Sequence, residues 1–176
     1  TVPAEHGYIR NLTQSPGIAE RFPAWSPDGK NVAYWSDRSG EYELYLRNGD
    51  GSGKEEKLTN LGAGFRYNLF WSPDSKKLVF MDNTQHIRLF DLETKKLTKV
   101  DFCPHLSHPN MQSFRPSWSA NSEWLAYIKH QPNGHSAIFL YNVNDKSIHQ
   151  ATSGYYSDFQ VSFDPEGKYL YFFTNR

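Results

Sequence analysis

A sequence repeat is the feature that most constrains how this chain folds. Four similar stretches read WSPDGKNVAYWS, WSPDSKKLVFMD, WSANSEWLAYIK and FDPEGKYLYFFT. Their aromatic anchors are Trp25, Trp71, Trp118 and Phe163, so successive anchors lie 46, 47 and 45 residues apart. A steady period of this length is typical of an array of similar structural units that stack on one another.

Each unit predicts four short β-strands joined by tight turns. In the first unit, a Pro-Asp-Gly turn follows Trp25, because proline presets φ and glycine accepts a positive φ. The β-rich run at 31–36 and the alternating run at 42–47 follow as strands. Four-stranded antiparallel units of this period are the blades of a β-propeller. We therefore predict an all-β fold made of propeller blades.

The repeats also predict how the chain is divided. We expect an outer strand of a preceding blade with a linker at 1–20, blades at 21–64, 65–112 and 113–157, and the first two strands of a next blade at 158–176. The first of these strands would end at Thr13, because RNLT at 10–13 resembles EKLT at 56–59, and this makes fifteen strands in all.

Two arrangements of these blades are open. The favoured one is an arc of a larger propeller, whose exposed apolar blade faces would promote self-association. The other is a closed four-bladed ring, in which the N-terminal outer strand pairs into the last blade. Known propellers have about four to eight blades, so a four-bladed ring and a larger propeller are both within the known range.

Composition argues against several partners. The 19 basic and 19 acidic residues cancel, so no basic surplus predicts nucleic-acid binding. No apolar run is long enough to predict a helix across a membrane. The single cysteine, Cys103, has no partner for an internal disulfide, which favours a reducing compartment.

Motifs for chemistry within the chain are weak. A serine hydrolase needs a nucleophile, a base and an oxyanion hole, and no Gly-x-Ser-x-Gly elbow is present, so we predict no catalytic residue. No motif predicts a cofactor. Cys103, His105 and His108 are a weak candidate metal site, because they lack an evident fourth ligand; an extended surface loop is the simpler interpretation.

The positions just before each anchor are better candidates for binding. They precede the innermost strands, and they differ between units while the structural positions repeat. Five residues before the anchors lie Glu20, Arg66, Ser113 and Asp158; four before lie Arg21, Tyr67, Phe114 and Phe159; three before lie Phe22, Asn68, Arg115 and Gln160. From these sets the predicted channel residues are Glu20, Arg21, Arg66, Tyr67, Arg115 and Asp158. Their charges would bias the passage of peptide termini, or the side chains would only solvate the rims.

The repeat motif resembles that of the propellers of tricorn proteases and of the TolB periplasmic protein. The resemblance is carried by PAWSPDGKNVAYWSDRSGEYELYL at 23–46 and covers almost the whole chain. Residues 10–29, 64–78 and 163–176 are closer to the tricorn pattern, whereas the third unit departs from it, with SANSEW in place of SPDGK. None of the catalytic motifs of that family matches a position in this chain.

The resemblance implies a function that is not catalytic in itself. Tricorn proteases are large serine peptidases, and the resemblance implies a propeller that admits substrates and releases products. We therefore expect a propeller segment that gates or docks peptides, with the remaining blades and the peptidase domain of the parent chain as partners. Alternatives are a TolB-like scaffold for protein partners, or the propeller cap of a prolyl-oligopeptidase-type hydrolase. The expected location is cytoplasmic, with periplasmic or exported as the alternative.

Overall fold

The computed structural model describes residues 9–104 and 110–176. Fourteen strands in these ranges form four antiparallel sheets, of which three have four strands and the last has two. This confirms the predicted all-β fold of four-stranded antiparallel units. One short 3-10 turn, η1 (Asn110–Ser113), interrupts the strands, and across the described ranges no helix is long and apolar enough to cross a bilayer.

The strands of each sheet follow chain order. The first sheet contains β1 (Glu20–Trp25), β2 (Asn31–Ser36), β3 (Glu43–Asn48) and β4 (Glu56–Lys57). The second contains β5 (Phe70–Trp71), β6 (Lys77–Met81), β7 (His86–Asp91) and β8 (Lys96–Phe102). The third contains β9 (Ser117–Trp118), β10 (Trp124–His130), β11 (Ser136–Asn142) and β12 (Ile148–Gln150), and the fourth contains β13 (Asp158–Phe163) and β14 (Leu170–Thr174).

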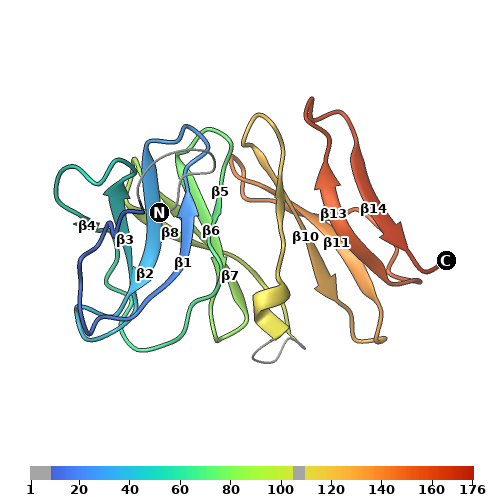
Figure 1. Cartoon of the computed structure of the whole chain (residues 1–176). Coiled ribbons are helices and arrows are strands. Elements are labelled where there is room, and N and C mark those ends of the chain that lie inside the picture. Colours follow the sequence, from blue (N-terminus) through green and yellow to red (C-terminus); the bar gives the residue numbers. More distant parts are fainter. Residues whose placement is uncertain (1–8, 105–109) are drawn as a thin grey trace.

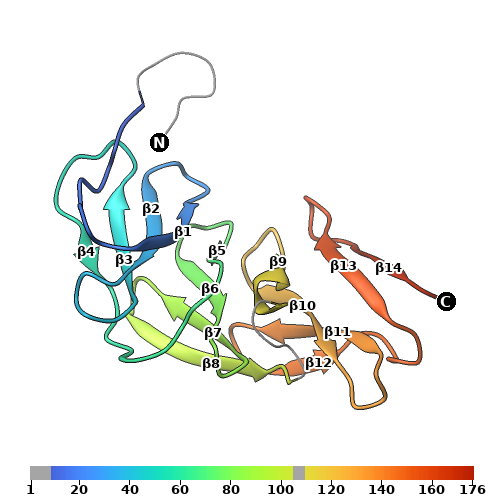
Figure 2. The same ribbon diagram turned by 60° about the horizontal axis from the view of Figure 1, so that its bottom comes forward.

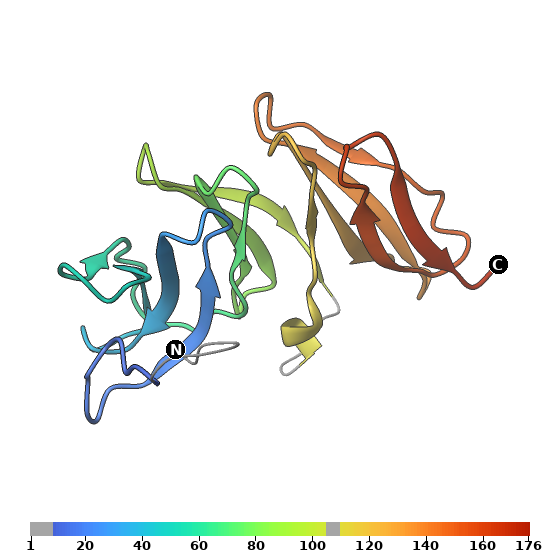
Figure 3. The same cartoon turned by 45° about the horizontal axis from the view of Figure 1, so that its top comes forward.

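The sheets are arranged in a row that follows the sequence. Figures 1 and 2 show the first sheet at one end and the two-stranded fourth sheet at the other. The first strands of neighbouring sheets adjoin, because the Trp71 indole N–H donates to the Ala24 carbonyl at 3.0 Å and the Phe163 amide donates to the Ser117 hydroxyl at 3.0 Å. From a third direction, β13 and β14 again lie beside the third sheet (Figure 3).

Apolar side chains fill the spaces between the sheets. One cluster lies between the first and second sheets and includes Trp35, Leu44 and Phe80, all almost fully buried. A second cluster joins the second and third sheets through residues such as Met81 and Tyr127. Since each sheet covers only one face of its neighbour, burying both faces requires sheets on both sides, which explains the repetition in the sequence.

The predicted strand at 10–13 is wrong. The described residues before β1 form no strand, and the Asn11 side-chain carbonyl accepts hydrogen bonds from the amides of Thr13 and Gln14 at 3.3 and 3.0 Å. This local turn competes with strand pairing. Leu12 instead packs against Val32, Tyr34 and Tyr45 on the open face of the first sheet.

The closed ring is not what the structure shows. Within the described residues, β14 pairs only with β13, and the first and fourth sheets lie at opposite ends of the row (Figure 1). The sheets therefore form an open arc. The strand positions can be compared with the predicted division of the chain. The strand β1 begins one residue before the range 21–64. The other three sheets lie within the ranges 65–112, 113–157 and 158–176.

Candidate functional site

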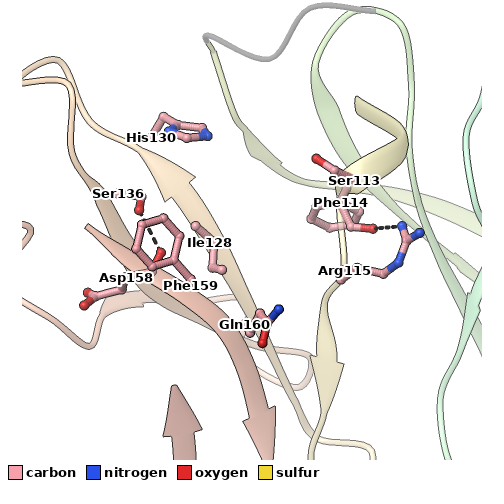
Figure 4. A pocket seen from close by; sticks show the side chains of 9 residues that line it. All are labelled: Ser113, Phe114, Arg115, Ile128, His130, Ser136, Asp158, Phe159 and Gln160. Atoms are coloured by element: carbon pink, nitrogen blue, oxygen red, sulfur yellow. Dashed lines mark hydrogen bonds between the residues drawn. The ribbon is translucent and has the colours of Figure 1, made fainter. Parts of the chain in front are cut away.

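A cavity of about 490 Å³ lies between the inner ends of the third and fourth sheets. Two segments line it from opposite sides, residues 113–115 before β9 and residues 158–160 at the start of β13. Ile128, His130 and Ser136 of β10 and β11 complete the wall. Figure 4 shows the Phe159 ring and Ile128 on one side and Phe114 on the other.

Local backbone geometry opens this space. β9 is only two residues long and η1 precedes it, so residues 113–115 form no ladder with β10. On the other side, the β13–β14 register shifts between Phe159 and Ser162, and Gln160 has a φ of 52°. Such a bulge bends a strand and redirects its side chains, and a positive φ in a residue other than glycine is uncommon. The two inner strands therefore meet at Ser117 and Phe163 and separate toward the cavity.

The charged residues at the cavity are already bonded within the protein. The buried Asp158 carboxylate accepts a 2.5 Å hydrogen bond from the Thr152 hydroxyl, and its main-chain carbonyl accepts one from Ser136 at 2.7 Å. The Arg115 guanidinium donates to the carbonyls of Gln112 and Phe114 and lies 5.8 Å from the Phe70 ring. In Figure 4 it points away from Phe159.

Glu20 and Arg21 lie at a different place, on the first sheet. The Arg21 guanidinium donates to the Tyr42 hydroxyl at 2.8 Å and lies over the rings of Tyr42 and Phe65. The Glu20 carboxylate accepts from Ser15 at 2.7 Å and pairs with Arg38 at 3.2 Å. Both residues border a second hollow of about 400 Å³, which is separate from the first.

Arg66 and Tyr67 are buried and do not border the first cavity, although Arg66 borders a separate hollow of about 320 Å³. Arg66 is 7% exposed, and its guanidinium donates to the main-chain carbonyls of Tyr42, Gly62 and Gly64 at 3.1, 2.9 and 2.7 Å. Burial lowers the pKa of Arg66 from its ordinary value. Tyr67 is 2% exposed in the cluster between the second and third sheets. Arg66 therefore ties the linker to the first sheet, whereas Tyr67 packs between the second and third sheets.

The structure thus brings together only part of the predicted set. Of the six predicted channel residues, Arg115 and Asp158 border the same cavity. Ser113, Phe114, Phe159 and Gln160, which occupy equivalent offsets before the anchors, border it too. Sequence reasoning missed Ile128, His130 and Ser136, because they lie on the second and third strands of a unit. The signal that could have found two of them is pairing, since His130 and Ser136 are opposite one another at the β10–β11 turn.

The weak metal candidate gains no support from Cys103. This thiol is 1% exposed, and its burial, together with the nearby Asp101 carboxylate, raises its pKa to about 12. A thiol that stays protonated is a poor metal ligand. His105 and His108 lie outside the described residues, and no group of three potential metal ligands occurs within the ranges that the structure describes.

Comparison with known proteins identifies the family. All of residues 1–176 match the family described as the tricorn protease second beta propeller domain. A putative tricorn-like protease C-terminal subunit of Sulfurisphaera tokodaii is 32% identical over 94% of this chain and 18% of the relative. The crystal structure of the tricorn protease is similar with a TM-score of 0.68 at 26% identity, over 88% of this chain and 15% of that one.

TolB shares the fold at a greater distance. The crystal structure of TolB from Acinetobacter baumannii has a TM-score of 0.55 at 20% identity, over 88% of this chain and 37% of that one. This chain therefore spans less than a fifth of the tricorn-like relative and of the tricorn protease, and its sheets are blades of a larger propeller. The chain belongs to the family of the tricorn protease second β-propeller domain.

Proposed function

We propose that this propeller segment docks or gates peptides on their path to the peptidase domain of a tricorn-like protease. The observation that carries the proposal is the cavity at the inner ends of the third and fourth sheets, beside the strands that would line a propeller channel. The names of the relatives support a peptidase as the parent protein. The segment itself would supply no catalytic residue, and its partners would be the remaining blades, the peptidase domain and peptides in transit. A cytoplasmic location, with export as the alternative, belongs to the same proposal.

A bulky plug at the cavity tests this role in the full-length protein. Gln160 is exposed at the cavity, so Gln160→Cys would carry a polyethylene-glycol maleimide there. The matched control is Asn144→Cys with the same label, because Asn144 is exposed in the turn between β11 and β12. The burial of Cys103 limits its own labelling.

We expect the plug to lower kcat/KM for long peptides several-fold and to affect very short fluorogenic substrates much less. The reason is that a long peptide must pass or dock at the channel wall, whereas a short one has more freedom to bypass it. Equal effects of the two labels on long peptides would show that the segment has no role in access. A TolB-like scaffold or a prolyl-oligopeptidase-type cap would then be reconsidered from the domains that follow it in the parent protein.

A further inference from the structure

We infer that the cavity between the third and fourth sheets is a subsite for one apolar, preferentially aromatic, side chain of an extended peptide. The inference rests on the proposed function, because it names what the segment would recognise. The sequence analysis expected charged side chains to select peptides; here apolar contact selects them instead. Four properties of the cavity lead to it.

The first property is size. A volume of about 490 Å³ falls within the range of about 300–1,000 Å³ that is typical of small-ligand sites. Aromatic side chains each bury roughly 150–250 Å² on binding, which makes them effective anchors. The cavity is therefore large enough for one aromatic side chain and too small for a folded partner.

The second property is the wall. Phe159 is 46% exposed, although phenylalanine is usually buried, and its ring borders the cavity with Ile128. Phe114 lies on the opposite side (Figure 4), but it is 7% exposed and packs against Phe70 in the cluster of the second and third sheets. A ring placed against Phe159 and Ile128 would remove the exposed Phe159 surface from water and gain an aromatic contact with it.

The third property is charge. In Figure 4 the Asp158 carboxylate and the Arg115 guanidinium both point away from Phe159, so neither charge faces that side of the cavity. Burying a charge without a partner is costly. The Phe159 side of the cavity therefore favours an apolar side chain over a charged one.

The fourth property is a pair of unengaged polar groups at the rim. Within the described residues, neither the Gln160 amide nor the His130 imidazole has a hydrogen-bonding partner, and both border the cavity. The bulge at Gln160 sets the direction of its side chain. An amide offers both a donor and an acceptor, which is what the main chain of an extended peptide requires.

The experiment compares two peptides in the full-length protein, identical except for one phenylalanine that is alanine in the second peptide. The phenylalanine is moved along the peptide to find the position with the greatest preference. Phe159→Ala then removes one wall of the cavity. Its control is Phe102→Ala, because Phe102 is 43% exposed at the end of β8 and does not border the cavity.

We expect Phe159→Ala to lower kcat/KM for the phenylalanine peptide by about 10-fold, the order of a lost apolar contact in a specificity pocket. The alanine peptide should change by less than about twofold, and Phe102→Ala should leave the ratio between the peptides unchanged. A second variant, Gln160→Gly, suits the positive φ at that position and removes the amide. It should weaken both peptides equally, because the main chain is common to them.

The outcomes separate this inference from the proposed function. An equal loss for both peptides with Phe159→Ala would overturn the apolar subsite while leaving access control intact. No loss with either peptide would also overturn the subsite, and the maleimide plug at position 160 would then decide whether access control itself survives.

Discussion

Arg66 shows that residues at equivalent positions of a repeat can lie in different surroundings. It occupies the same offset before its anchor as Glu20, Ser113 and Asp158. The residue is nevertheless buried, with one guanidinium nitrogen shared between three main-chain carbonyls. A buried guanidinium is stable only when such partners replace its water. Reversing its charge would therefore disturb the linker and would say little about peptide passage.

We predict that Arg66→Lys lowers the free energy of unfolding by about 2 kcal/mol, the scale of lost hydrogen bonds to a charged group. A lysine ammonium lacks the planar geometry and the reach to keep all three carbonyls. Arg115→Lys is the control, since Arg115 is exposed and surface changes usually stay within about 0.5 kcal/mol. Urea unfolding of the two variants measures the difference. Equal losses would mean that the three carbonyls do not hold Arg66 in place.

Cys103 gives a second prediction at the scale of one residue. The thiolate is the reactive form, and a pKa of about 12 leaves almost none of it at pH 8, whereas an unfolded cysteine with a pKa of about 8.5 is partly ionised. Alkylation of Cys103, followed by peptide mapping, should be at least about a hundredfold slower in the native protein than in denaturant. Fast native labelling would contradict this. Added Zn²⁺ that blocked such labelling would revive the metal hypothesis.

At the scale of elements, the turns after the anchors also connect neighbouring sheets. Ser75 and Ser122 stand where the first unit has Gly29, and all three have a positive φ. The Ser75 hydroxyl accepts from the Asp28 amide at 3.2 Å, and the Ser122 hydroxyl accepts from the Asp74 amide at 3.0 Å. The serine therefore offsets its backbone strain with a hydrogen bond to the preceding sheet. This explains why the second and third units tolerate the loss of the glycine of the SPDG turn.

Two substitutions at Ser122 separate the strain from the hydrogen bond. Ser122→Ala keeps the strained φ of 59° and removes the bond, so the free energy of unfolding should fall by about 1 kcal/mol. Ser122→Gly also removes the bond but relieves the strain, which is worth about 1 kcal/mol or slightly more, so its net effect should be close to zero. Thermal unfolding measures both variants. An alanine variant as stable as the glycine variant would show that φ carries no cost at this position.

Strand positions were predictable where the sequence repeats itself. The aromatic anchor, the turn and the alternating run locate β1, β2 and β3 closely, because these signals are local. The expected strand at 10–13 failed, because its resemblance to residues 56–59 says nothing about a pairing partner. Asn11 formed a local turn instead. A strand is defined by its neighbour, and that information is absent from a short motif.

At the scale of the whole molecule, the site could be predicted only as a set of positions counted back from the aromatic anchors. Positions before the anchors found Arg115 and Asp158, and the unselected Phe159 and Gln160, at one cavity. The equivalent positions of the first two units instead border two other hollows or lie in the packed interior. The second sheet packs closely on both of its neighbours, whereas β1 and β13 carry the same bulge, with a φ of 52° at Phe22 and at Gln160, and each borders a hollow. Such differences in packing depend on side chains from several strands.

The fourth sheet presents a row of exposed aromatic side chains. Tyr169, Tyr171 and Phe173 are 65%, 62% and 67% exposed, and they alternate along one face of the C-terminal hairpin. Within the described residues, β14 also has no partner on its outer edge. Contiguous apolar patches and open strand edges both promote association. In the parent protein, we expect further repeats to cover this surface.

A polypeptide of residues 1–176 alone should therefore self-associate, and its average mass in sedimentation or light scattering should rise with concentration. Replacing Tyr171 and Phe173 by lysine on the same face should reduce this association, because charged side chains protect a sheet edge from pairing. Phe102→Lys is the control: Phe102 is also exposed, but it lies on the outer strand of an interior sheet, so that variant should associate as the unmodified polypeptide does. A constant monomer mass at all concentrations would show that the aromatic face needs no cover. If the double lysine variant associates as before, the contact lies instead on the open face of the first sheet, where Trp25 is 48% exposed.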